Sequence, residues 1–222
     1  MKHSVLLAED DESIAKLVMF KLGKIDAESS WAKNGKEAIE FMGKRPFSLV
    51  LLDVMMPEKD GWQVLEAIRA QDKEKSRRTV VLMLTARAQE DEDSVARRGA
   101  DGLIKKPFDP AVLAERVEMA LLRIDFVATF PERISGLEKA VRQFEEDPTE
   151  KKALIEIKAI VHRVAGTGAS YGFENLSKSF LEFDSWIEGR VTAESPLSPA
   201  DQSHVLSRAR GCLEMLKREQ GS

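Results

Sequence analysis

The sequence lacks several features that would assign it to a specialised class of proteins. Only one of its 222 residues is a cysteine, Cys212, which excludes an internal disulfide and a metal cluster built from cysteines. No apolar run is long enough to span a membrane, and the apolar stretch near the N-terminus is too short to be a secretory signal. We therefore expect a soluble, cytoplasmic protein that does not insert into membranes.

The sequence also lacks an excess of positive charge. Its 34 basic and 38 acidic residues give a formal net charge of -4, so it has no electrostatic footprint for a nucleic-acid backbone, and we expect no nucleic-acid partner. Hydrophobic residues make up 43% of the chain, which is enough for a well-packed core. The length suits one or two domains.

The first half of the chain alternates β-rich apolar runs with segments of helical period, which is typical of an α/β domain with a parallel sheet. A helix after residue 109 has a strong start, with Asp109 as N-cap and Pro110 in the first turn. The polar segment 88–98 is only weakly helical. The five predicted strands are residues 4–8, 27–32, 48–53, 79–85 and 102–105.

Reactive side chains follow the predicted strands where each one ends. Because parallel strands bring their carboxyl ends to one edge, we expect these side chains to meet there: Glu9, Asp10, Asp53, Thr85 and Lys106. Crowded carboxylates need a cation, and Mg²⁺ prefers such oxygen ligands. We predict a Mg²⁺ site with Asp53 as the nucleophile that takes a phosphoryl group, while lysine and hydroxyl groups neutralise its charge.

Each of these residues alone has an ordinary structural explanation. An acidic run before a helix commonly caps it, a threonine that ends a strand reflects β-propensity, and a single lysine is usually solvated. The combination favours a functional site, because four strands deliver complementary groups to one edge. We assign Asp11 to the helix cap rather than to the metal.

Residues 1–124 resemble a response-regulator receiver domain, through "LLAEDDE", "LVLLDVMMPEKDGW", "MLTA" and "GADGLIKKPFD". The resemblance implies a flavodoxin-like five-stranded parallel sheet and phosphorylation of Asp53. It also implies that Asp10, Asp53 and the Met55 carbonyl hold Mg²⁺, with Glu9 acting through water.

The same resemblance assigns roles to the last two strand ends. Thr85 would follow the phosphoryl group and Lys106 would contact it. Lys105 is excluded, because the lysine of the family directly precedes a proline through a bond that is commonly cis. The family often has an aromatic residue three positions before that lysine, where this sequence has Leu103.

The second half, residues 125–222, contains four helical patterns and no β-rich run. Polar and proline residues interrupt the patterns within 145–150 and 190–199. A four-helix bundle is the simplest packing, which makes the second domain all-α. No Gly/Ser-rich linker separates the two halves.

One bundle helix carries the unusual stretch "HRVAGTGASYG", which begins at His162. With the apolar residues of this helix in the core, His162 lies at the edge of the buried stripe, and Gly166 and other small residues follow on its flank. We interpret the small residues as clearance that lets a second active site reach the ring, with Lys158 balancing an arriving phosphoryl group. Three alternatives remain open: a half-buried structural histidine, a helix end capped by Gly172, and a nucleotide loop, which the missing GxGxxG spacing disfavours.

Residues 125–222 resemble a histidine-containing phosphotransfer (HPt) domain, including that of chemotaxis-type kinases, through "HRVAGTGASYGF". The resemblance implies that His162 is phosphorylated and that Gly166 clears its flank. The lysine that the family has three residues after the histidine is Ala165 here.

We therefore predict a phosphorelay protein that moves phosphoryl groups between aspartate and histidine. No nucleotide-binding loop is visible, so we expect no ATP-dependent kinase activity. Its only catalysis would be autocatalytic phosphorylation of Asp53, with phosphate from a histidine kinase or small phosphodonor. Histidine kinases and other receiver domains are the expected partners. The alternatives are an adaptor or dimerisation module with a non-catalytic bundle, and a fragment of a longer response regulator.

Overall fold

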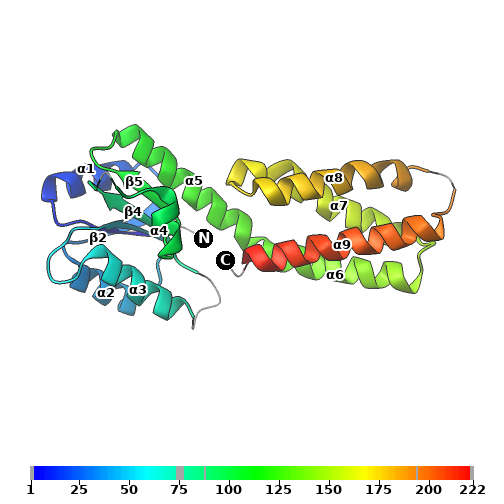
Figure 1. The fold of residues 1–222 in the computed structure, drawn as a ribbon, viewed down its shortest axis with the longest axis horizontal. Coiled ribbons are helices and arrows are strands. Elements are labelled where there is room, and N and C mark those ends of the chain that lie inside the picture. The colour runs from blue at the N-terminus through cyan, green and yellow to red at the C-terminus, as the bar shows by residue number, and fades with distance from the viewer. Residues whose placement is uncertain (1–2, 74–77, 88, 194, 221–222) are drawn as a thin grey trace. The chain divides into compact units, whose positions relative to one another are not determined.

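The computed structural model describes residues 3–73, 78–87, 89–193 and 195–220. They form two compact units, which divide between Ile124 and Asp125 (Figure 1). Among the described residues, no helix is both long and apolar enough to cross a membrane.

The first unit contains a five-stranded parallel sheet in the order β2-β1-β3-β4-β5. The fold class predicted from the sequence is confirmed, and each strand matches its predicted bounds to within one residue. The strands are β1 His3–Ala8, β2 Ala27–Ala32, β3 Leu49–Asp53, β4 Val80–Thr85 and β5 Gly102–Lys105.

Helices cover both faces of this sheet (Figure 1). Alternate strand residues point to opposite faces, so Val5 and Leu7 pack with α1 and α5, whereas Leu6 and Ala8 pack with α2 and α3. The polar segment 88–98 is helical over only six residues, and Ala88 lies outside the described residues. The helices are α1 Glu12–Leu22, α2 Gly35–Lys44, α3 Gly61–Asp72, α4 Glu92–Arg97 and α5 Pro110–Ala128.

Two predicted helix starts are confirmed by their hydrogen bonds. The Asp11 carboxylate accepts from the amides of Ser13 and Ile14, 2.8 and 3.0 Å away, and caps α1. Asp109 accepts from the amide of Ala111 at 2.7 Å, directly before α5 begins. Asp11 is therefore engaged with its own helix, while Asp10 remains exposed beside it.

The second unit is a four-helix bundle, in which α6 and α8 each pack on both α7 and α9 (Figure 1). Its core includes four fully buried phenylalanines, which belong to the apolar patterns seen in the sequence: Phe130, Phe144, Phe180 and Phe183. The predicted break within 190–199 includes Glu194, which lies outside the described residues. The helices are α6 Phe130–Glu146, α7 Lys151–Thr167, a short 3₁₀ turn η1 Ala169–Tyr171, α8 Glu174–Val191 and α9 Pro199–Gln220.

Arg69 on α3 forms hydrogen bonds with the end of α3 and with the loops that precede β4 and β5. Its guanidinium donates to the carbonyls of Gly99 and Thr79 and to the carboxylates of Asp72 and Asp101, each 2.7 or 2.8 Å away. Asp101 also accepts from the Val81 amide at 2.8 Å. Arg69 thus pairs with two carboxylates, and the Asp101 carboxylate also pairs with Arg78.

We expect Arg69→Ala to lower the free energy of unfolding by about 2–4 kcal/mol, because Asp72 loses its arginine partner, Asp101 keeps only Arg78, and the carbonyls of Gly99 and Thr79 each lose a donor. Urea denaturation followed by circular dichroism measures the loss. Arg97→Ala is the matched control, since Arg97 is exposed on α4, and it should cost less than about 0.5 kcal/mol. Equal losses for the two variants would contradict this assignment.

Candidate functional site

Three carboxylates meet at the edge of the sheet where the strands end. Glu9 and Asp10 follow β1, and Asp53 is the last residue of the neighbouring strand β3. One carboxylate oxygen from each lies within 4.8 Å of the others. Glu9 and Asp53 are buried, whereas Asp10 is exposed, so the cluster opens to solvent on the side of Asp10.

Lys106 bridges the two buried carboxylates. Its Nζ lies 2.9 Å from Asp53 Oδ2 and 2.7 Å from Glu9 Oε2. The residue follows β5, where its amide donates to the Thr85 carbonyl at 2.7 Å, and its bond to Pro107 is cis. Lys105 instead lines a separate pocket, so the structure brings Lys106 to the cluster and not its neighbour.

The charges of this cluster do not balance. Burial raises the pKa of Glu9 to about 7, and the charge of Asp53 adds to this rise while Lys106 opposes it. Burial alone would lower the pKa of Lys106, but its bonds to Glu9 and Asp53 raise it above the ordinary value. One ammonium thus faces three carboxylates, and an added cation would relieve their repulsion.

Thr85 and Met55 lie beside Asp53. Thr85 ends β4 and is buried, and its hydroxyl accepts from the Arg87 amide at 3.0 Å. The Met55 amide donates to Asp53 Oδ1 at 3.3 Å. The Arg87 guanidinium lies 3.0 Å from the Met55 sulfur, and the sequence had not indicated that this arginine would reach the site.

Gly61 lets the next helix begin directly behind Asp53. A Cβ at this position would lie 2.2 Å from the Asp53 carbonyl oxygen, so no other residue fits without moving the backbone. Asp60 caps α3 in a capping box with Gln63. The end of β3 and the start of α3 are therefore held close together, which fixes the backbone of Asp53.

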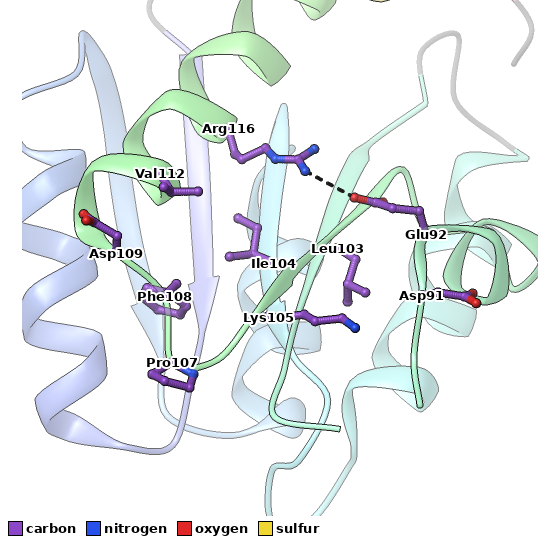
Figure 2. Close-up of a pocket in the computed structure, with 10 residues that line it drawn as sticks. All are labelled: Asp91, Glu92, Leu103, Ile104, Lys105, Pro107, Phe108, Asp109, Val112 and Arg116. Atoms are coloured by element: carbon purple, nitrogen blue, oxygen red, sulfur yellow. Dashed lines mark ion pairs between the residues drawn. The ribbon is translucent and has the colours of Figure 1, made fainter. Parts of the chain in front are cut away.

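A cavity of about 470 Å³ lies between α4, β5 and α5 (Figure 2). Glu92 and Arg116 form an ion pair of 3.5 Å across it. Leu103 and Lys105 line the cavity, whereas Lys106 and the carboxylate cluster of Glu9, Asp10 and Asp53 do not. The Lys106 side chain contacts Glu9 and Asp53 instead. The phosphorylation-site residues and the cavity are therefore in different places.

His162 on α7 pairs with a carboxylate on the neighbouring helix. Its Nδ1 lies 2.8 Å from Asp184 Oδ2 on α8. The histidine side chain is 67% exposed, whereas the Asp184 side chain is 12% exposed. The second oxygen, Asp184 Oδ1, is buried and has no hydrogen-bond partner among the described residues. Such a buried, incompletely bonded carboxylate is costly to a fold and marks a functional candidate.

The helix surface one turn after His162 is open at Gly166. A Cβ on Gly166 would meet nothing within 4 Å. Lys158 forms an ion pair with Glu188 on α8, so the carboxylate partly neutralises the ammonium charge. The glycine-rich stretch also ends the helix: α7 stops at Thr167, and Gly172 has a positive φ of 80°.

Comparison with known proteins covers mainly the first unit. A family model described as "Response regulator receiver domain" matches residues 5–118. The chain is 36% identical over 129 residues to a probable transcriptional regulator, ycf27, of Porphyra purpurea. This match covers 58% of this chain and 51% of the relative. It is 36% identical over 124 residues to the transcriptional regulatory protein SrrA of Staphylococcus aureus, covering 55% and 49%.

Among solved structures, NtrX from Brucella abortus has a TM-score of 0.54 and 27% identity, covering 61% of this chain and 31% of that one. The chain spans about half the length of the curated relatives it matches. The family match ends at residue 118, before the second unit begins.

Proposed function

Because the chain belongs to the response regulator receiver domain family, we propose that Asp53 accepts a phosphoryl group from a histidine kinase or a small phosphodonor. We also propose that His162, on an HPt-like second domain of residues 125–222, exchanges that group with an aspartyl phosphate. The observation that supports the step at His162 is its exposed ring, which pairs with the buried carboxylate of Asp184.

In the aspartate half, a carboxylate oxygen of Asp53 attacks the phosphorus of the donor. A P–O bond to Asp53 forms, and the bond from phosphorus to the donor nitrogen or oxygen breaks. Lys106 already touches Asp53 Oδ2 and would contact the bound phosphoryl group. Thr85 ends the adjacent strand and supplies a hydroxyl that would follow it.

The acidic cluster fits Mg²⁺. Asp10 and Asp53 offer carboxylate oxygens and Met55 a backbone carbonyl, while Glu9 would act through water. A bound Mg²⁺ would neutralise charge on the phosphoryl oxygens as the group is transferred. The excess of carboxylates over ammonium groups in the cluster supports this assignment.

In the histidine half, the hydrogen bond to Asp184 selects the nitrogen that reacts. A carboxylate can only accept, so Nδ1 carries the proton and Nε2 keeps its lone pair. Nε2 attacks the phosphorus of an aspartyl phosphate, a P–N bond forms, and the P–O bond breaks to release the aspartate carboxylate. The Nδ1 proton stays on the ring, and Asp184 stabilises the imidazolium that results.

Gly166→Leu tests whether the open flank serves transfer. We expect this variant to lower the rate of phosphoryl transfer to His162 by at least about tenfold, because the leucine side chain would obstruct the approaching site. The space around Gly166 is open, so the substitution should raise helix stability by about 1 kcal/mol. Gly211→Leu on α9, where space is equally open, is the control. An unchanged rate of transfer to His162 in Gly166→Leu would show that the open flank has no role in transfer.

The labelling chemistry tests the proposal against an adaptor with a non-catalytic bundle. Purified chain incubated with candidate histidine kinases and ATP should acquire acid-labile, base-stable phosphate that is lost in His162→Ala. The aspartyl phosphate is base-labile and is lost in Asp53→Ala. Phosphate on Asp53 alone, with every competent donor, would support the adaptor.

The relatives named transcriptional regulators are longer than this chain, and their names say nothing of its own output. The absence of a nucleic-acid partner stays a prediction from the net charge.

A further inference from the structure

Two arginines of the second unit, Arg133 on α6 and Arg163 on α7, lie on facing turns of neighbouring helices. The two helices pack on each other and are joined by a short loop, so they run antiparallel. A Cβ on Gly136 would lie 3.2 Å from Ile160 Cδ1, which shows where α6 and α7 meet. Arg133 lies one turn before this contact and Arg163 one turn after it, so the antiparallel register places the two arginines opposite each other.

The guanidinium groups of both arginines lack an acidic partner. Among the described residues, neither one forms an ion pair, and Arg163 Nε donates to the Ala159 carbonyl of its own helix at 3.2 Å. Arg133 Nη1 is buried and has no hydrogen-bond partner in the part of the chain that the structure describes. Such a buried donor is costly to the fold and calls for an acceptor.

The electrostatics of Arg133 also indicate a missing anion. Burial lowers the pKa of Arg133, and the positive charge of Arg163 lowers it further. Glu132 and Tyr171 act in the opposite direction but do not cancel this shift. Two like charges that face each other without a counterion repel, and an anion between them would remove this repulsion.

Aromatic rings hold Arg133 in place. Its guanidinium carbon, Cζ, lies 5.0 Å from the centroid of the Phe126 ring. The centroids of the Tyr171 and Phe130 rings lie 4.9 and 5.2 Å from that of Phe126. Phe126 and Phe130 are buried, so the guanidinium rests on a rigid support and loses little freedom when it binds a ligand.

We propose that Arg133 and Arg163 form a binding site for the phosphate group of a small soluble molecule. A planar guanidinium presents N–H donors in a fork that matches phosphate oxygens. The two groups carry two positive charges, which a phosphate dianion balances and a single carboxylate does not. The anion enters between the two guanidinium groups, and Arg133 Nη1 gains the acceptor that it lacks. The half-buried ring of Tyr171 offers a contact for an organic group attached to the phosphate.

This site is independent of phosphoryl transfer. Arg163 follows His162 in the sequence, but the two side chains serve different neighbours. His162 pairs with Asp184 on α8, whereas Arg163 faces α6. The phosphate group would be bound there as a ligand, and no bond to it would form or break.

Isothermal titration calorimetry of the full chain with inorganic phosphate tests the site. EDTA is present, so that phosphate does not bind through a metal ion at Asp53. We expect saturable binding that Arg133→Gln and Arg163→Gln each weaken by about tenfold. Arg142→Gln is the matched control, because Arg142 is an exposed arginine elsewhere on α6, and it should leave the affinity unchanged.

Melting temperatures measured without phosphate establish that each variant is folded. Because Arg163 is exposed, Arg163→Gln should melt as the native chain does, and it keeps the test decisive if Arg133→Gln does not fold. Phosphate should raise the melting temperature of the native chain more than that of Arg163→Gln.

Three results would overturn the proposal. The first is the absence of saturable phosphate binding by the native chain, and the second is an affinity that Arg163→Gln leaves unchanged. The third concerns a lipid as the source of the same phosphate chemistry. Cosedimentation with phosphatidic acid vesicles that Arg163→Gln abolishes, without binding of inorganic phosphate, would assign the arginines to a membrane surface and not to a soluble ligand.

Discussion

Asp53→Ala is expected to abolish phosphorylation of the receiver unit by acetyl phosphate and Mg²⁺. Asp53 contacts Lys106 and accepts from the Met55 amide, and its strand partner on β4 is Leu84, the residue before Thr85. Without its oxygen no acyl phosphate can form there. Radioactive labelling, followed by treatment of the product with base, measures the effect.

Folding of this variant must be established separately. Lys106 keeps its ion pair with Glu9 when Asp53 is lost, so we expect the unit to stay folded with an unchanged circular dichroism spectrum. Asp93→Ala, at an exposed position on α4, controls for the general loss of an acidic residue. Base-labile labelling of folded Asp53→Ala at the native rate would refute the assignment of the nucleophile.

The aspartate site could be predicted from the sequence because each of its residues stands at the end of a strand. Parallel strands end at one edge, so the positions of Asp53 and Lys106 along the chain determine their meeting once the five strands are identified. Arg87 could not be found in this way. It lies two residues beyond β4, where the backbone has left the sheet and strand periodicity no longer predicts the direction of a side chain.

The bundle site was less accessible to sequence analysis. Helical period placed His162 at the edge of the core, and this agrees with its exposure. The pairing with Asp184 depends on how α7 and α8 align, which no pattern within a single helix determines. The sequence signal was an acidic residue beside the core residue Phe183, within a mainly apolar face. Lys158 was expected to balance the charge of an arriving phosphoryl group, and the same alignment gives it Glu188 as an ion-pair partner.

Asp184→Ala is expected to slow phosphoryl transfer to His162 on the order of a hundredfold. The carboxylate holds the proton on Nδ1, directs Nε2 toward the phosphorus and stabilises the positive ring that forms during attack. Without it, both ring nitrogens compete for the proton and the ring is free to rotate. The measurement is single-turnover transfer of label from an aspartyl phosphate, with His162→Gln defining complete loss.

Two further substitutions separate positioning from simple structural damage. Asp184→Asn retains an oxygen that can accept from Nδ1 but removes the charge, so it should recover part of the rate that alanine loses. Glu182→Ala removes an exposed acid on α8 that pairs with Arg208 at 3.3 Å, and it should transfer at the native rate. If Asp184→Asn were as slow as Asp184→Ala, orientation of the ring would not be the contribution of the carboxylate. If both Asp184 variants matched the native rate, the pair with His162 would have no part in transfer.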